Sequence, residues 1–323
     1  MCSDATMAYV SPMPLRSASL LTFLYALGYP VGALAVSALS PMAVLVLRFS
    51  LAAAILGGWA LLARVSWPTR MALVHVLVSG LLAQGVLFVC LYLALEHGAP
   101  AVLGAVVVSM NPVVTALLVA MFLGESLTVS RVVALVLGAA AVLAACAGRL
   151  RSVGGVDAAM WLLVAALIGI AAGGVYQQRF CANVDFRVTA TLQNAACVGP
   201  VVVLASLSPV TVHNLGHAVA AVGAVVLLNA MLCMTMYVRA ISLYGAATVS
   251  MMFCVIPAVA GLLAWVMLGQ RADVGIVSGL VLGAVACWLN ARASGRQQRQ
   301  HDPAGNGGGQ HRVDTVHRAS VAG

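Results

Sequence analysis

Ten apolar stretches, each about the length of a membrane-spanning helix, occupy most of this 323-residue chain. A helix of about 20 mainly apolar residues crosses the hydrocarbon core of a bilayer. The chain is 63% hydrophobic and only 7% charged, so it has too little polar surface to cover a water-soluble globule. We therefore predict an all-α integral membrane protein with ten transmembrane helices. They are expected at about 17–39, 41–63, 71–95, 99–123, 129–147, 158–178, 188–207, 217–239, 245–268 and 273–291.

The positive charges set the expected orientation, because loops rich in basic residues stay in the cytoplasm. All 16 basic residues are Arg. With a cytoplasmic N-terminus, twelve of them fall inside and three outside (Arg149, Arg151 and Arg271), while Arg48 lies within the second stretch. We therefore expect both termini in the cytoplasm. An anionic lipid surface suffices as the partner of the +8 net charge, so no nucleic acid is implied.

The ends of the chain differ from its apolar body. Residues 1–16 form the expected cytoplasmic N-terminal segment and lack the pattern of a cleaved signal peptide. Residues 292–323 are polar and Gly-rich, so we predict a disordered, solvated cytoplasmic tail in preference to one that binds lipid or metal. Between these ends we expect two five-helix units, at 17–147 and 158–291, joined by a linker at 148–157.

The two five-helix units show an internal duplication with an interval of 145 residues. Pro112 precedes a Leu-Gly pair by the same distance as Pro257 does. One interval that works across most of the chain indicates a repeat. Because each unit has an odd number of spans, the second copy enters the membrane from the opposite side, which predicts two inverted repeats. The interval also pairs Gly28 with Gly173, Gln84 with Asn229, Tyr92 with Tyr237, and Gly138 with Gly283.

The duplicated prolines, Pro112 and Pro257, interrupt apolar stretches at matching places. A proline inside a helix removes a backbone hydrogen bond and clashes with the preceding turn. Interrupted helices at matching positions of inverted repeats are typical of secondary transporters, whose substrates bind near the membrane midplane. The prolines either kink packed helices or act as hinges beside a cavity. Their duplication, and the polar Asn111 beside Pro112, favour the hinge.

Two strings then carry a resemblance to a known family: NPVVTALLVAMFLGESLTVSRVVALVLGAAAVL from Asn111 and IPAVAGLLAWVMLGQRADVGIVSGLVLGAVA from Ile256. Each has a proline, a run of small residues and Leu, a Leu-Gly pair and a Gly-bearing final span. With Arg48-Phe49 and GVYQQRF at 174–180, the chain resembles EamA-type carriers of the drug/metabolite transporter superfamily over residues 17–291. The resemblance implies export of metabolites, amino acids or drugs across the inner (plasma) membrane. Gln270 departs from the pattern, since a Glu is usual there.

Polar side chains within the apolar stretches are the candidate substrate contacts, because such groups are costly in a bilayer and face a bundle interior or a cavity. Gln84, Phe88 and Tyr92 follow one another at the spacing of one helix face. We favour a cavity lining over hydrogen bonds between helices. Tyr25 and Gln177 are weaker candidates. The predicted substrate-binding set is Gln84, Phe88, Tyr92, Asn111, Asn229, Tyr237, Tyr29 and Arg48, with Pro112 and Pro257 as hinges.

Arg48, about seven residues into the second stretch, has two interpretations. It counters a substrate carboxylate, or it is structural and reaches the membrane interface with its long side chain. The interval of 145 pairs it with the neutral Gln193. From the residues alone, the structural role is slightly favoured.

The sequence predicts no catalytic, metal or cofactor site. All eight acidic residues lie at the edges of the apolar stretches or outside them, so no midplane carboxylate relay is expected. A Walker-type motif requires a Lys, and the chain has none. We therefore predict a secondary transporter of hydrophobic or zwitterionic small molecules that is not an enzyme. A membrane receptor, scaffold or intramembrane enzyme is the alternative class. Substrate, direction, coupling ion and homodimer formation stay open.

Overall fold

The computed structural model describes residues 13–123, 129–153, 157–270, 274, 276–285 and 288–289. Within these ranges every regular element is helical, and the β-type pairing is an isolated bridge between Leu39 and Val212. Seven of the described helical segments are long and apolar enough to cross a membrane, and one bent pair of helices supplies an eighth. The all-α prediction is confirmed.

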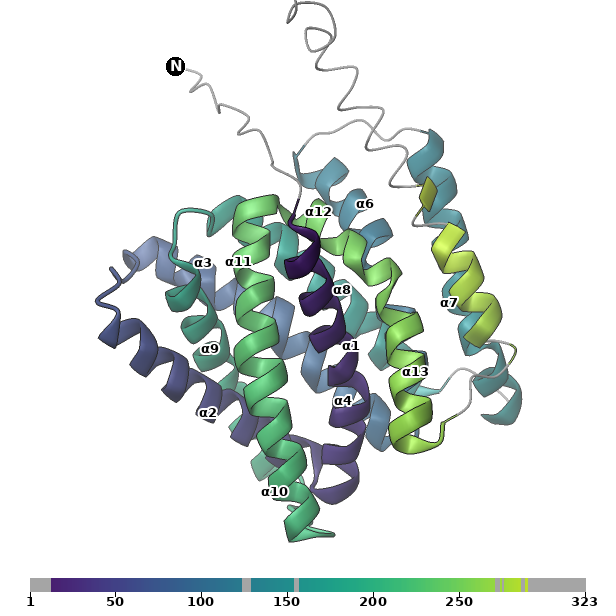
Figure 1. Cartoon of the computed structure of the whole chain (residues 1–323), viewed down its shortest axis with the longest axis horizontal. Helices are drawn as coiled ribbons and strands as arrows, with labels where there is room; N and C mark the ends of the chain where they lie inside the picture. The colour runs from purple at the N-terminus through teal and green to yellow at the C-terminus, as the bar shows by residue number, and fades with distance from the viewer. Residues whose placement is uncertain are drawn as a thin grey trace, which may run out of the picture.

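The first half of the chain begins with two long helices, and shorter helical elements follow them, some without a gap between one element and the next (Figure 1). In chain order they are α1 (Leu15–Ala38), α2 (Pro41–Leu62), α3 (Arg70–Gly80), η1 (Leu81–Val86), α4 (Leu87–Glu96), α5 (Ala101–Val108), α6 (Asn111–Leu123) and α7 (Val129–Val153).

The second half repeats this order. Its elements are α8 (Ala158–Phe180), α9 (Phe186–Ser206), α10 (Leu215–Ala224), η2 (Val225–Cys233), α11 (Met234–Tyr244), α12 (Ala246–Ser250), η3 (Met251–Cys254) and α13 (Ile256–Leu268), and residues 276–285 are also helical.

Two matching elements, η1 and η2, are π-helices. Each is continuous with the α-helices before and after it, in the middle of one long segment. Shifted by 145 residues, η1 falls inside η2, so the distortion is duplicated. Gln84 lies in η1 and Asn229 in η2. Because π-helices are rare and are often found at functional sites, they mark this level of the bundle as special.

The duplicated prolines lie at helix starts. α5 ends at Val108, a turn follows, and α6 begins at Asn111 with Pro112 second. In the other half Pro257 is second in α13, and α12–η3 meets α13 at a bend of 45°. A proline is well tolerated in the first helical turn, where the N–H it lacks has no partner within the helix. The structure therefore places a break in the helix before each proline, and the hinge role stays a prediction.

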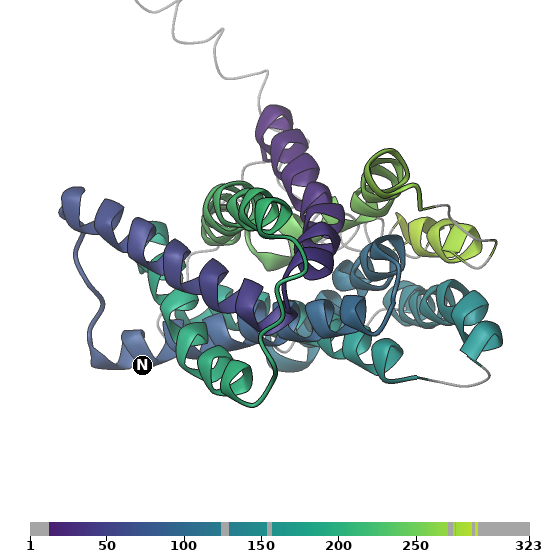
Figure 2. The same cartoon turned by 90° about the horizontal axis from the view of Figure 1, so that it is seen from below.

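The helices pack in pairs that match between the halves. α2 packs along α9 (Figure 2). α1 lies between α13 and the α10–η2 segment, and α8 correspondingly contacts α6 and the α3–η1 segment. Each of these contacts becomes another observed contact when the two halves are exchanged.

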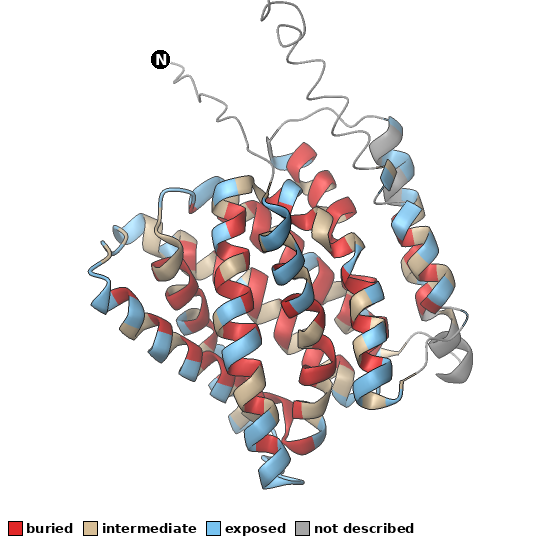
Figure 3. Cartoon of the chain, in the orientation of Figure 1, coloured by how far each residue is buried: buried red, intermediate tan, exposed pale blue. Residues whose placement is uncertain are grey.

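Burial follows this packing, with buried residues on the inner faces of the helices and exposed ones on the outer faces (Figure 3). The outward side of α2 exposes the apolar residues Leu47, Leu51 and Ile55. This fits a surface that faces lipid, which needs to be apolar. The largest fully buried side chains include one charged residue, Arg48, together with Tyr92, Phe49 and Phe253.

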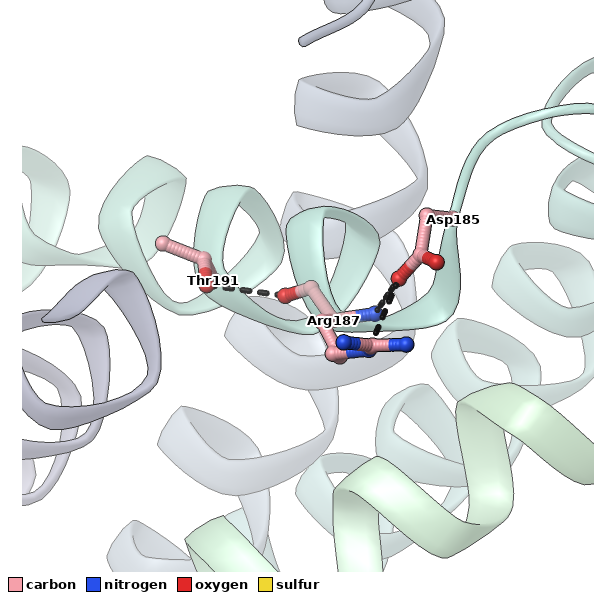
Figure 4. Close-up of polar contacts among 3 residues, drawn as sticks. All are labelled: Asp185, Arg187 and Thr191. Carbon is pink, nitrogen blue, oxygen red and sulfur yellow. Dashed lines mark hydrogen bonds and ion pairs between the residues drawn. The ribbon is translucent and has the colours of Figure 1, made fainter. Parts of the chain in front are cut away.

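The beginning of α9 is fixed by local polar contacts (Figure 4). The carboxylate of Asp185 accepts from the backbone N–H of Arg187 at 2.8 Å and pairs with its guanidinium at 3.5 Å. Thr191 then donates to the carbonyl of Arg187. Arg187 also lies over the ring of Trp59, with its Cζ 5.4 Å from the centroid, so this end of α9 is attached to the end of α2.

Candidate functional site

Arg48 is a fully buried charge with few partners. Its Nη2 donates to Oδ1 of Asn229 at 3.1 Å, and its Cζ lies 3.3 Å from the centroid of the Phe88 ring. Its Nε and Nη1 have no hydrogen-bond partner. No described acidic side chain forms an ion pair with it. Because its side chain has no exposed surface, Arg48 does not extend to the membrane interface, and that part of the structural interpretation is wrong.

A second polar group is centred on Gln193 of α9. Its Oε1 accepts from Nε2 of Gln84 at 3.2 Å. Its Nε2 donates to Oγ of Ser79 at 3.0 Å and to Oε1 of Gln177 at 2.9 Å. Gln177 in turn donates to the carbonyl of Val238. The side chains of this network are buried, and both polar atoms of the Gln193 amide are satisfied.

These two groups occupy equivalent positions. The interval of 145 relates Arg48 to Gln193 and Gln84 to Asn229. The bond between Arg48 and Asn229 is therefore the counterpart of the bond between Gln193 and Gln84. Both bonds join the second span of one half to the π-helix of the other. Phe88, four residues after Gln84, packs against the guanidinium of Arg48, which brings the two bonds into one central region.

Close backbone approach holds the two π-helices against neighbouring spans. A Cβ on Gly28 of α1 would lie 2.3 Å from Nδ2 of Asn229. A Cβ on Gly173 of α8, the equivalent glycine, would lie 2.4 Å from the backbone nitrogen of Ala83. A side chain at position 173 would meet the backbone of Ala83, whereas one at position 28 would meet only the end of the Asn229 side chain, which can move.

A cluster of aromatic side chains forms around the two tyrosines of α1. The Tyr25 ring lies 4.7 Å from the Phe253 ring, 6.0 Å from Tyr237 and 6.3 Å from Tyr29, measured between centroids. The hydroxyls of Tyr25 and Tyr29 are buried without a partner. Tyr237 lies close to the side chain of Asn111. The aromatic cluster, defined as Tyr25, Tyr29, Tyr237 and Phe253, thus joins α1, α11 and η3, and the start of α6 lies beside it.

A cavity of about 640 Å³ opens at the C-terminal end of α1. Its walls include Ala33 of α1, Glu96 at the end of α4, and Gln270. Tyr29 lies one helical turn deeper than Ala33 on α1, so the aromatic cluster lies beneath this cavity. A separate apolar groove of about 500 Å³ lies between α2 and the α10–η2 segment, lined by residues such as Leu47, Leu51 and Val222.

Comparison with known proteins places this arrangement in a family. The sequence pattern of the EamA-like transporter family matches residues 16–146 and again residues 157–292. The chain belongs to the EamA-like transporter family. The sequence-based resemblance is therefore confirmed, and the EamA-family chain is a membrane-embedded, multi-pass protein of a transporter family with two EamA repeats.

Similarity in fold extends to solved structures. The EamA-family chain is similar to a crystal structure described only as that of a protein, with a TM-score of 0.63 and 18% sequence identity, covering 88% of this chain and 100% of the other. At this identity the likeness shows the fold alone. No curated protein matches the chain in sequence.

The eight predicted substrate contacts of the EamA-family chain are all buried. The structure brings Arg48, Asn229 and Phe88 into direct contact, and the Phe88 and Tyr92 rings meet edge to face. Tyr29, Tyr237 and Asn111 belong to the aromatic cluster or lie beside it. Gln84 joins the Gln193 network instead. Their role in substrate binding stays a prediction.

Two residues that the sequence did not single out contribute to the site. Ser79 accepts from Gln193, and Phe253 packs on Tyr25. Neither is duplicated: the interval of 145 pairs Ser79 with Ala224 and Phe253 with Val108. The repeat therefore carried no signal for them.

Gln270, the departure from the family pattern, also has a structural role. Its Oε1 accepts from the backbone N–H of Ala101 at 3.1 Å, at the beginning of α5. Gln178 does the same for Ala246 at the beginning of α12, at 2.8 Å. Each glutamine thus satisfies a helix N–H that has no partner within its own helix, Gln270 in the opposite repeat and Gln178 in its own. The first repeat's equivalent of Gln270, Glu125, lies outside the described residues.

Proposed function

We propose that the chain is a secondary transporter that exports small metabolites, amino acids or drugs across the inner (plasma) membrane by alternating access. The observation that carries the proposal is the pair of equivalent hydrogen bonds, Arg48 with Asn229 and Gln84 with Gln193, each between a second span and the opposite π-helix. Polar groups at this depth are costly, and in transporters of repeated architecture the substrate site lies where the repeats meet.

The architecture we propose is ten transmembrane helices in two inverted five-helix repeats, with both termini in the cytoplasm. Helix covers part of each of the ten predicted stretches within the described residues. The packing supports a two-fold relation, because exchanging the repeats converts the contacts of α1 with α13 and η2 into those of α8 with α6 and η1. The Arg distribution supports the orientation.

Alternating access then requires the two repeats to move relative to each other around the buried residues. The hydrogen bonds between the repeats are discrete contacts, such as those of Arg48 with Asn229 and of Gln193 with Gln84. Discrete bonds can open and close, whereas a continuous polar interface would resist separation. The cavity at the end of α1 would be the approach from one side, and the aromatic cluster would separate it from Arg48 in the conformation described. The breaks before Pro112 and Pro257 would let α6 and α13 reorient.

Measurement of exported solutes tests this proposal. Cells lacking the protein, cells producing it, and cells producing the double variant Gln84→Leu/Asn229→Leu are compared for small molecules inside and outside. We expect at least one solute to accumulate outside only with the parent protein. Identical solute profiles in all three, with the parent protein inserted in the membrane, would refute a transport function.

A further inference from the structure

We propose that the substrate carries a single carboxylate on an otherwise apolar or aromatic body, and that Arg48 binds this carboxylate. The inference rests on the proposed transport function and specifies the substrate class of the same site. It concerns the charge of the substrate, which membership of the family does not determine.

The first argument is an incomplete set of partners around a buried cation. Arg48 has no exposed surface, donates from Nη2 to one amide oxygen, and leaves Nε and Nη1 without a partner. Within the described residues no acidic side chain balances its charge. A buried charge is normally paired, since an unpaired one is costly to remove from water. The planar guanidinium matches a carboxylate through two parallel hydrogen bonds, which an incoming substrate can supply.

The second argument limits the substrate to one negative charge at this site. The equivalent position of the other repeat holds Gln193, whose amide is neutral and whose oxygen and nitrogen are both hydrogen-bonded. A dianion would therefore neutralise Arg48 and leave one buried negative charge uncompensated. A cationic substrate would meet a like charge. A monocarboxylate leaves the site neutral.

The third argument concerns the rest of the substrate. The face of Phe88 is covered by the guanidinium, and Tyr92 packs edge to face on Phe88. The aromatic cluster above supplies further rings, and within it the hydroxyls of Tyr25 and Tyr29 lack partners. Rings with a few polar atoms form the usual lining of small-molecule sites and favour an apolar or aromatic body.

Asn229 then acts as a neutral substitute for the substrate. Its Oδ1 occupies one donor of Arg48, but an amide oxygen carries no full negative charge. A carboxylate therefore gains more from the guanidinium than Asn229 does. The variant Asn229→Asp tests this directly, because it would place a permanent carboxylate beside Arg48 that competes with the substrate.

The first experiment measures binding with four probes of one shape. The purified full-length protein in detergent is titrated with 3-phenylpropanoate, 3-phenylpropanamide, 3-phenylpropylamine and benzylmalonate, and the midpoint of thermal unfolding is followed. We expect the monocarboxylate to bind roughly tenfold or more tightly than the other three, because it alone gains a charge-assisted pair without leaving a buried charge uncompensated. Equal binding of the amide and the carboxylate would overturn the proposal.

Variants separate recognition from folding. Arg48→Gln reproduces the neutral residue of the other repeat and should abolish the preference for the carboxylate, while Arg48→Lys should keep a reduced preference. Asn229→Asp should raise the unfolding midpoint and weaken 3-phenylpropanoate binding by about tenfold. Arg64→Gln, which removes an exposed charge just beyond α2, is the matched control and should bind as the parent does. Unchanged carboxylate preference in folded Asn229→Asp and Arg48→Gln would refute the role of Arg48.

Flux into proteoliposomes tests the transport function separately from carboxylate recognition by Arg48. Saturable 3-phenylpropanoate flux that Arg48→Gln abolishes supports both the transport function and the role of Arg48. Carboxylate binding that depends on Arg48, with no flux of any probe, would count against transport and leave the recognition intact. Flux of the amide or the amine equal to that of the carboxylate would overturn the recognition and leave transport intact.

Discussion

Arg48 donates from Nη2 to Oδ1 of Asn229 across 3.1 Å, joining α2 of the first repeat to η2 of the second. The two equivalent positions hold Gln193 and Gln84, which are bonded across 3.2 Å. The repeat thus preserves a contact between the same positions while its chemistry differs, one copy being charged and the other neutral. If Arg48 binds the substrate carboxylate as proposed, only one of the two equivalent places can hold an anion.

Loss of the Asn229 amide should cost more stability than loss of the Gln84 amide. Asn229→Leu removes the hydrogen-bonded partner of Arg48 and should destabilise the protein by about 1–3 kcal/mol, the usual cost of a buried polar group left unsatisfied. Gln84→Leu leaves Gln193 with two of its bonds and should cost about 1 kcal/mol. Both variants should transport more slowly than the parent, with Asn229→Leu the more impaired. Thermal unfolding and flux of the same preparations check the order.

The control for this comparison is the amount of each variant inserted in the membrane. Both variants should insert as the parent does, because neither change adds polarity to a membrane span. If both variants transported at the rate of the parent, the buried amides would be structural, and the substrate site would lie elsewhere.

The glycines beside the π-helices provide a matched pair with opposite expected outcomes. An Ala at position 173 would place its Cβ against the backbone of Ala83, which cannot move away alone, so Gly173→Ala should destabilise by about 1–3 kcal/mol. An Ala at position 28 would press on the end of the Asn229 side chain, which can rotate away from Arg48. Gly28→Ala should therefore cost less stability and more activity. Unfolding midpoints and flux for the two variants test this, and a reversed order would contradict it.

Much of the architecture was predictable because the bilayer imposes it. Spans must be long and apolar, so stretches such as 17–39 and 41–63 agree with α1 and α2 within a few residues. The interval of 145 also predicted which residues are equivalent. It paired Gln84 with Asn229 as equivalent positions without any knowledge of the fold.

The contacts of those residues were not predictable from helical spacing. Gln84, Phe88 and Tyr92 were expected on one face, but the π-helix η1 ends between Gln84 and Phe88 and changes the number of residues per turn there. Gln84 bonds to Gln193, whereas Phe88 lies beneath Arg48. Nothing in the local sequence marks a π-helix, and the close approach of α8 to η1 involves a distant part of the chain.

The topology prediction now has a structural basis. The bridge between Leu39 and Val212, and the cavity that Glu96 shares with His213, place those loops at one end of the bundle. Contacts of Trp59 with Phe186 and of His75 with Tyr176 mark the other end. With the orientation that the Arg distribution predicts, reporter fusions near positions 66 and 183 should be cytoplasmic, as should one near 300 in the tail, which lies outside the described residues. Fusions near 97 and 212 should be outside. A fusion near 183 active only outside the cytoplasm would exclude inverted repeats.

The last prediction concerns Pro112 and Pro257, each the second residue of a helix that follows a break. In Pro112→Ala the new N–H can donate to the carbonyl of Val108 and continue α5 into α6; in Pro257→Ala it can donate to Phe253. One such bond contributes about 0.5–1.5 kcal/mol. If reorientation of α6 and α13 must break it, the flux should fall up to about tenfold, while probe binding stays within about twofold of the parent. The effect should be larger for Pro257→Ala, because α13 is bent by 45° from the preceding segment, whereas Ala101–Phe122 forms one span. Equal flux in the double variant and the parent would remove the hinge role. Loss of binding by a folded variant would instead assign this break to the substrate site, with Asn111 the first residue to exchange.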